Sequence, residues 1–182
     1  ALFNYIWLIH DNASAIVVDP TCAAPVLDYL SQHNLRLISI LLTHRHPDHI
    51  AGTPELQAKL GGLPIYGPSS IAAVTHPLQD GDAFSIALMP SLNVQVLYTP
   101  GHTDDHLCYH INQQHLFCGD VLFSAGCGRI FPLLGGNLPD AYQSIQKLTT
   151  LPDDTLIYCA HEYTLSNLNF ALDLLPNDAE LL

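Results

Sequence analysis

The spacing of apolar residues in the first quarter of the chain predicts a hairpin, a helix and a buried strand. Residues 3–9 and 15–18 are rich in β-branched and aromatic side chains, and the turn-forming pair Asp11-Asn12 separates them, which is typical of a β-hairpin. Residues 23–33 place apolar side chains on one helical face, and the continuous apolar run at 37–42 indicates a buried strand. The expected order is therefore β-β-α-β.

The rest of the chain alternates short strands with helices. Thr53 and Pro54 favour a second helix over residues 53–60, with Thr53 as its cap and Pro54 at the first helical position. A Gly-rich loop is expected at 124–137. Further strands are expected at residues 64–66, 84–88, 94–99, 107–111, 115–118 and 155–159, and further helices at 139–148 and 162–174. This mixture predicts an α/β (α+β) fold in which two sheets pack face to face with helices outside.

The composition fits one domain, residues 1–182, with a sizeable core, since 48% of the residues are hydrophobic. Five cysteines stand singly, so we expect free thiols, a reducing compartment and hence the cytoplasm. The longest apolar runs are far shorter than the roughly 20 residues of a membrane-spanning helix, so we expect a soluble protein. A net charge of -12 argues against nucleic acid and anionic membranes as partners.

The residues that carry chemistry begin directly after the apolar run at 37–42, with Thr43-His44-Arg45-His46-Pro47-Asp48-His49. Imidazole and carboxylate groups are donors that suit zinc, iron or manganese. Clustered histidines gain nothing in an ordinary fold and repel one another when they protonate. The segment therefore predicts a metal site.

One short loop cannot supply every ligand, so further His or Asp residues are expected at other strand ends. His102, Asp120 and His161 each follow a predicted strand directly. This shared placement predicts that they meet the first loop. The remaining histidines are expected to be ordinary surface or core residues: His10, His33, His76, His106, His110 and His115.

The chain resembles the metallo-β-lactamase-fold hydrolases and, within them, is most similar to glyoxalase II, the hydroxyacylglutathione hydrolases. The HxHxDH loop marks the superfamily, and two later segments point to glyoxalase II: Gly126-Cys127-Gly128-Arg129 and His161-Glu162-Tyr163-Thr164. Matching segments run through nearly the whole chain. The resemblance implies a four-layer αβ/βα sandwich.

The resemblance also implies two divalent metal ions, one on His44, His46 and His102, and a second on Asp48, His49 and His161, with Asp120 bridging them. Such a pair lowers the pKa of a shared water, so that hydroxide attacks a glutathione thioester of the S-lactoylglutathione type and both ions stabilise the oxyanion. Asp48, His44 and His46 are the expected catalytic residues, and Asp48 could orient the hydroxide as well as bind metal. Zinc is the expected metal, with iron and manganese as alternatives.

Substrate contacts follow from the same resemblance. Arg129 and Phe131 would contact the glutathione moiety, and Tyr163 would offer a hydroxyl to the same peptide. The family's C-terminal helical segment, which carries further basic contacts, does not follow in the sequence given, which stops at Leu182. If the protein ends there, we expect poor glutathione affinity; if the sequence is a fragment, we expect a whole catalytic core with half of the substrate pocket missing. Asp105 stands where the family usually has glycine, and we expect it to be a loop carboxylate rather than a partner of His102.

Three other functions remain open at this point. A persulfide dioxygenase would use one iron and oxygen. A β-lactamase fits less well because of the bridging role given to Asp120. A non-catalytic metal-binding module would bind metal and hydrolyse nothing. We expect a monomer.

Overall fold

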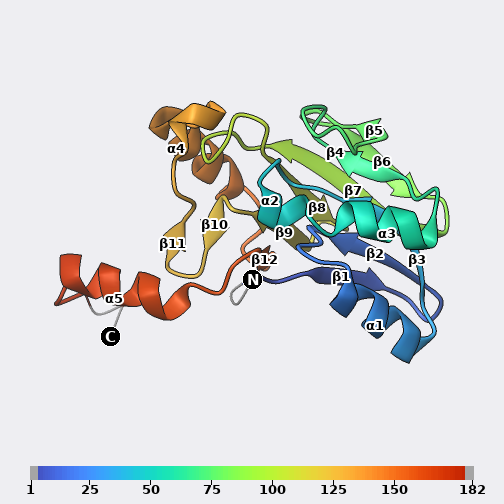
Figure 1. The fold of residues 1–182 in the computed structure, drawn as a ribbon. Coiled ribbons are helices and arrows are strands. Elements are labelled where there is room, and N and C mark those ends of the chain that lie inside the picture. The colour runs from blue at the N-terminus through green and yellow to red at the C-terminus, as the bar shows by residue number, and fades with distance from the viewer. Residues whose placement is uncertain (1–3, 179–182) are drawn as a thin grey trace.

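Two five-stranded sheets form the centre of the computed structural model, which describes residues 4–178 (Figure 1). The first sheet has the order β1-β2-β3-β4-β5 and comprises β1 (Trp7–His10), β2 (Ser14–Val18), β3 (Arg36–Leu41), β4 (Ile65–Gly67) and β5 (His76–Pro77). The second has the order β12-β9-β8-β7-β6 and comprises β6 (Ala83–Ile86), β7 (Met89–Tyr98), β8 (Leu107–Ile111), β9 (His115–Gly119) and β12 (Leu156–Cys159).

The main core lies between the two sheets. Ile16 and Ile38 from the first sheet pack with Val96, Tyr109 and Phe117 from the second, and all five are buried. Burying one such aliphatic or aromatic side chain contributes about 1.5–3 kcal/mol, so this layer holds the sheets face to face. Alternate residues of β2 and β3 point to the opposite face of the first sheet.

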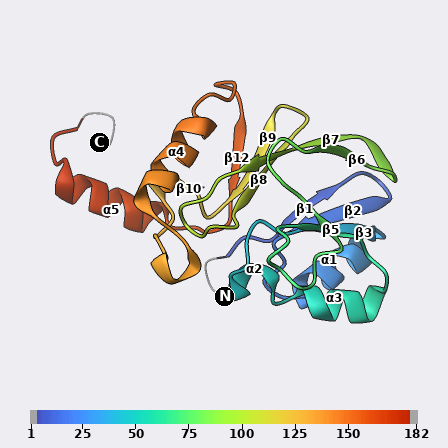
Figure 2. The ribbon, with the colours of Figure 1, turned by 90° about the horizontal axis from the view of Figure 1, so that it is seen from above.

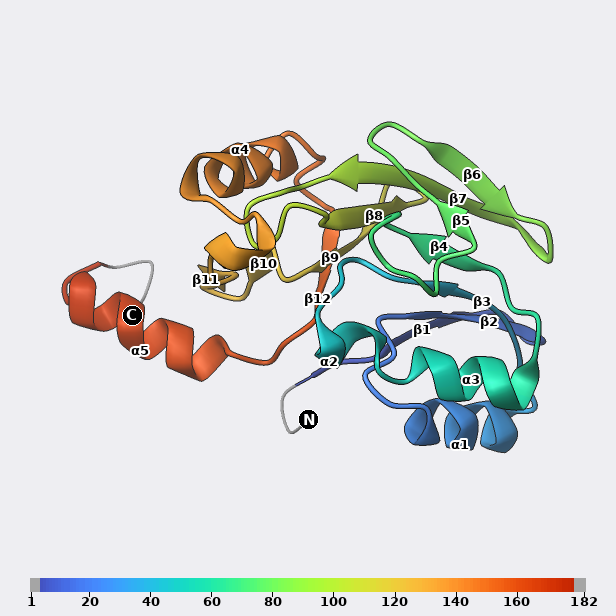
Figure 3. The same cartoon turned by 45° about the horizontal axis from the view of Figure 1, so that its top comes forward.

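Helices cover the outer face of each sheet. Helices α1 (Ala24–His33) and α3 (Thr53–Leu60) lie against the first sheet, where Val26 and Leu56 are buried. Helix α4 (Leu138–Leu148) lies against the second sheet (Figures 2 and 3). The four layers are helix, sheet, sheet and helix, which confirms the fold class expected from the sequence.

Local details differ from the sequence-based predictions. Thr53 is the first residue of α3 and not its cap, because Gly52 takes the cap position and no side chain bonds the free amides. Residues 47–50 form the short helix α2 (Pro47–Ile50) inside the predicted metal loop. The Gly-rich loop contains a small hairpin, β10 (Leu122–Phe123) with β11 (Gly126–Cys127), and the 3-10 helix η1 (Pro132–Leu134). Residue 3 of the predicted hairpin lies outside the described residues.

Helix α5 (Thr164–Leu174) differs from the other helices because it projects away from both sheets (Figures 1 and 3). None of its residues is buried. Within residues 4–178, no helix combines the length and the apolar character needed to cross a bilayer.

The pairing directions bring several strand ends to one edge. β2 and β3 run parallel, as do β9 and β12, and β7 and β9 both run antiparallel to β8. The loops that follow β2, β3, β7, β9 and β12 therefore leave their sheets at corresponding ends, which places distant polar residues within reach of one another.

Candidate metal centre and cleft

The loop after β3 presents its histidines on one side. Residues 42–46 are neither helix nor strand, and His46 has extended backbone angles (φ -61, ψ 140) before α2 begins at Pro47. His44 and His46 converge, whereas Arg45 between them reaches the opposite way, toward Asp104. Helix α2 then carries Asp48 and His49 as consecutive residues of one turn.

Three imidazoles meet around a common point. His46 Nδ1 lies 2.9 Å from His44 Nε2 and 2.9 Å from His102 Nε2. The three rings are mutually edge-on, with centroids 4.7–4.9 Å apart. Asp120 approaches the same point, since its Oδ2 is 3.3 Å from His102 Nε2.

The hydrogen-bond network assigns the tautomers of two of these rings. His102 Nδ1 lies 2.6 Å from the carbonyl oxygen of Arg129, so it donates its proton there and leaves Nε2 as a lone pair. His44 Nδ1 lies 3.0 Å from Thr43 Oγ1, whose own proton goes to Asp19. His44 Nε2 therefore also points a lone pair at the shared centre.

A second group of donors stands beside the first. His161 Nε2 lies 3.6 Å from Asp48 Oδ2, and His49 Nε2 lies 4.0 Å from the same oxygen. Asp120 Oδ1 is 3.4 Å from His49 Nε2 and 3.3 Å from His161 Nε2. The two oxygens of Asp120 thus face different groups, one toward His102 and the other toward His49 and His161.

Asp19, which was not among the predicted site residues, orients this second group. Its Oδ2 lies 2.8 Å from His49 Nδ1, and its two oxygens also accept hydrogen bonds from the Thr43 amide and hydroxyl. Asp19 follows the last residue of β2 and has a positive φ of 48°. His102 was selected because it follows a predicted strand closely. The same criterion would have found Asp19, which directly follows the predicted strand at 15–18.

Burial and charge shift the pKa values in the cluster. Burial lowers the pKa of His44 well below its usual value, and it also lowers that of His102. Burial alone would lower the pKa of His49 too, but the carboxylates of Asp19 and Asp120 raise it to about 10. Burial opposes ionisation of Asp120, yet the neighbouring imidazoles of His161 and His49 keep its pKa far below the usual range.

The donor set fits metal ions. Two groups bring their donor atoms within 4.8 Å of one another: His44, His46, His102 and Asp120, and Asp48, His49 and His161. His49 Nε2 and Asp120 Oδ1 are buried and have no hydrogen-bond partner, which is costly for polar atoms unless a ligand satisfies them. Imidazole nitrogens and carboxylate oxygens are suitable ligands for divalent transition metals. The cluster can therefore bind metal ions.

His106, expected to be an ordinary histidine, is a fully buried one that supports the cluster from behind. Its Nε2 accepts a hydrogen bond from the Asp120 amide at 3.1 Å, and its Nδ1 lies 3.1 Å from Thr99 Oγ1. Burial and the nearby imidazoles lower its pKa to about 3, so the ring stays neutral and keeps this acceptor. Nothing in the sequence distinguished it from the other isolated histidines.

A cleft of about 900 Å³ opens over the donor atoms. The three predicted substrate residues all line it: Arg129, Phe131 and Tyr163. Phe131 packs edge-on to His46, with ring centroids 4.8 Å apart, and Tyr163 stacks on His161 at 4.9 Å. Further lining residues were not predicted: Phe123, Cys127, Asn167 and Phe170.

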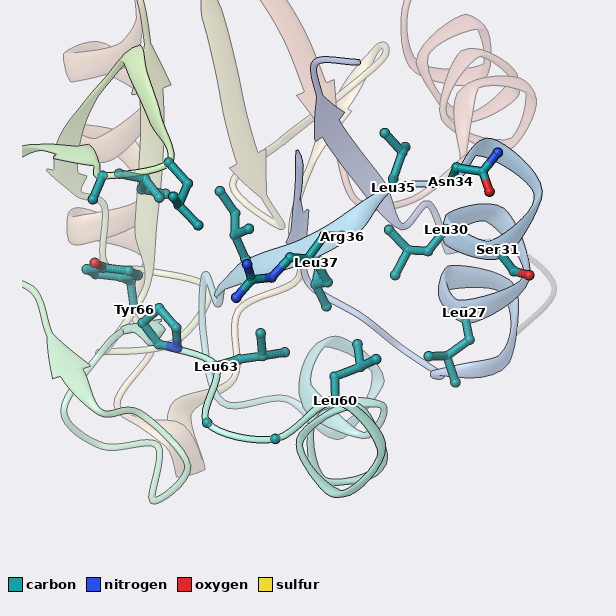
Figure 4. A pocket seen from close by; sticks show the side chains of 17 residues that line it. Leu27, Leu30, Ser31, Asn34, Leu35, Arg36, Leu37, Leu60, Leu63 and Tyr66 are labelled. Atoms are coloured by element: carbon teal, nitrogen blue, oxygen red, sulfur yellow. The ribbon is translucent and has the colours of Figure 1, made fainter. Parts of the chain in front are cut away.

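Another cavity, of about 760 Å³, lies at the opposite end of β3 (Figure 4). Its walls are mainly aliphatic, with Leu30, Leu60 and Leu63 among them and Arg36 as their charged residue. No histidine, cysteine or carboxylate is among the described residues that line it, so it offers no acid–base or metal chemistry. The cleft over the histidines is the candidate active site.

Comparisons with known proteins agree with this geometry. The model of the family described as the metallo-beta-lactamase superfamily matches residues 1–161. A hydroxyacylglutathione hydrolase of Nitrosomonas eutropha (strain DSM 101675 / C91 / Nm57) is 48% identical over 181 residues, which is 98% of this chain and 69% of the relative. One from Aliivibrio fischeri (strain ATCC 700601 / ES114) is 47% identical over 182 residues, with the same coverage.

Solved structures share the fold. ETHE1 from Myxococcus xanthus superposes with a TM-score of 0.77 and 33% identity, covering 88% of this chain and 71% of that one. The BLEG-1 B3 metallo-beta-lactamase superposes with a TM-score of 0.78 over 87% of each chain, at 24% identity, which is a likeness of fold alone.

Proposed function

Because the chain belongs to the metallo-beta-lactamase superfamily and, within it, to the hydroxyacylglutathione hydrolases, we propose that it hydrolyses a glutathione thioester to a hydroxy acid and glutathione. S-lactoylglutathione is the substrate type we infer. The observation that carries the proposal is Asp120, whose two carboxylate oxygens face separate donor groups. A carboxylate shared in this way suits a pair of metal ions better than a single ion.

The proposed ligands are those that the cluster brings together. His44, His46 and His102 would hold one ion, and Asp48, His49 and His161 a second, with Asp120 between them. Bound there, divalent ions would supply a water of lowered pKa and positive charge opposite an oxyanion. Zinc is the proposed metal because imidazole-rich sets with one or two carboxylates suit it well, and the same set accepts iron or manganese.

The residues around the ions have separate tasks. Asn4 Nδ2 donates to Asp48 Oδ2 at 3.1 Å and so fixes a carboxylate that stays partly open to the cleft, where it can accept a proton from an attacking water. His102 and His49 are held in the required tautomers by the Arg129 carbonyl and Asp19. A thioester releases a thiolate readily, so the site needs no strong general acid.

The wall of the cleft would recognise the thiol carrier. Glutathione is anionic and this chain has a net charge of -12, so binding requires a local positive charge. Arg129 supplies one beside Phe131, with its Cζ 6.0 Å from the ring centroid, and Tyr163 lies across the cleft floor on His161. We propose these three as contacts of the glutathione moiety. The five free thiols support a reducing compartment, the cytoplasm, and we propose a monomer of one domain.

The test combines metal counting with a thioester assay. Purified protein should hold two metal ions per chain and consume S-lactoylglutathione with release of a free thiol. Asp120→Ala should lose most of this activity and at least one ion, whereas Asp28→Asn, a surface change on α1, should keep both. One iron per chain with oxygen uptake on glutathione persulfide would instead establish a dioxygenase. Two bound ions with no thioester cleavage would indicate a non-catalytic module.

A further inference from the structure

Two loops carry the three histidines of the first donor group. The side chain of Arg45 links these two loops. Arg45 Nη2 lies 2.7 Å from Asp104 Oδ1, and Nη1 lies 3.3 Å from Asp105 Oδ2. Arg45 Nη2 also donates to the carbonyl of Leu134 at 2.9 Å. One guanidinium thus contacts two other segments of the chain, the loop that follows His102 and the 3-10 helix η1.

The position of Arg45 in the sequence shows which loops these contacts join. It stands between His44 and His46, and its acidic partners follow His102 by two and three residues. His46 and His102 are 56 residues apart, yet their ring nitrogens lie 2.9 Å from one another. The contact between Arg45 and Asp105 is therefore a cross-link between the two loops that carry these histidines, apart from the point where their ring nitrogens converge.

The environment of Asp105 makes this cross-link stronger than an exposed ion pair. Only 7% of its side chain is exposed, against 55% for Asp104. Its carboxylate also accepts hydrogen bonds from Ser70 and Thr103, so it is fixed from three directions. Ion pairs in contact with water are worth little, whereas a nearly buried carboxylate that loses its cation is costly.

We propose that Arg45 is a positioning residue that sets the spacing of the His44–His46 and His102 loops and thereby the metal affinity of the site. The proposal rests on the ligand set proposed above. Arg45 would act by fixing the distance between the two loops, because its side chain touches neither the donor atoms nor the cleft. Asp105 is the nearly buried partner in this contact.

The test measures metal affinity directly, by competition with a chromophoric chelator for Zn²⁺, without any thioester. Arg45→Met should weaken binding on the order of 10- to 100-fold, as changes behind metal ligands commonly do. Asp105→Asn should act in the same direction, and the double variant should lose less than the two losses combined, because both remove one link. Arg45→Lys should restore part of the affinity, because a lysine keeps the charge without the fork of donors.

Lys59→Met provides the control, since it removes an ion pair to Glu55 within α3, outside the ligand loops. It should leave metal affinity unchanged. Wild-type affinity in a folded Arg45→Met protein would overturn the proposal, and so would an equal loss in Lys59→Met. If Arg45→Met does not fold, as judged by circular dichroism, Asp105→Asn decides the matter. If the metal affinities change as expected but the protein cleaves no thioester, the result would contradict the proposed activity and leave the role of Arg45 standing.

Discussion

Asp19 Oδ2 lies 2.8 Å from His49 Nδ1 and turns the other nitrogen of that ring toward Asp48 and Asp120. The same carboxylate accepts the Thr43 hydroxyl proton, and Thr43 then accepts from His44. One buried acid therefore sets the ring orientation of a histidine in each donor group. Such partners determine how well a metal site binds, although they never touch the metal.

Asp19→Asn should weaken metal binding on the order of 10- to 100-fold, since an amide cannot serve both Thr43 and His49 as an acceptor. Chelator competition on the purified protein measures the loss. Asp28→Asn on the surface of α1 is the control and should bind normally. Unchanged affinity in a folded Asp19→Asn protein would show that His49 needs no such partner.

Gly128→Ala should damage the site by steric overlap. A Cβ at this position would lie 1.8 Å from the Asp120 carbonyl oxygen and 3.0 Å from His102 Nδ1, so the loop must move away from two ligands. We expect a loss of about 1–3 kcal/mol in the free energy of unfolding, together with reduced metal content. Urea titration and elemental analysis measure the two effects.

Gly62→Ala is the matched control for Gly128→Ala, because no atom lies within 4 Å of its added Cβ. Because φ is positive at 58°, we expect backbone strain to lower the free energy of unfolding by about 1–2 kcal/mol. The metal content should stay unchanged. Equal metal loss in the two variants would mean that the close approach at Gly128 is unimportant.

Arg129→Met should raise KM for a glutathione thioester by about tenfold, because it removes a charged hydrogen-bond donor from the cleft wall. The backbone carbonyl of residue 129, which orients His102, is retained. Steady-state kinetics on S-lactoylglutathione measure the change. A small thioester without carboxylates should be hydrolysed by both proteins with a similar KM, and a matching rise for that compound would point to damage at the metal centre.

Cys108 should make the fold sensitive to alkaline pH. Burial raises its pKa to about 12, from an ordinary value of 9.0. Above pH 9 the unfolded thiol loses a proton that the folded one keeps, so this contribution to stability is complete below pH 9 and is lost as pH rises toward 12. Urea unfolding at pH 8 and pH 10 should show a decrease that is smaller in Cys108→Ala.

Thiol labelling checks the same burial independently. In the native protein, Cys22 and Cys127 are exposed and should react quickly with an aromatic disulfide reagent, whereas Cys108 and Cys118 are buried and should react only on unfolding. Rapid native labelling of Cys108, identified by mass spectrometry, would contradict the assigned environment.

The strands and helices were largely predictable because their apolar spacing is strong. The hairpin of β1 and β2, the buried strand β3 and helix α4 all lie within a few residues of their expected positions. The cap of α3 was wrong, since a preceding glycine rather than Thr53 takes that position. The hairpin of β10 and β11 was missed because each of its strands has two residues and no periodicity to detect.

The candidate site was predictable where residue type and strand ends coincide. His102, Asp120 and His161 follow strands whose ends meet the His44 loop, and they lie beside it in the structure. The supporting residues were harder to find, because their roles depend on contacts across the fold. His106 and Arg45 look ordinary in sequence, and only the packing of β8 and the loops shows what they contact.

Helix α5 contributes Asn167 and Phe170 to the cleft although none of its residues is buried. Asn167 ties it to the β10–β11 hairpin through the Ser124 carbonyl. The metal-binding residues follow strands of the two sheets, whereas this side of the cleft is formed by a helix that projects away from both sheets. Variation along α5 could consequently retune which acyl or thiol groups the enzyme admits, with the reaction chemistry left in place, so the two properties are free to evolve independently.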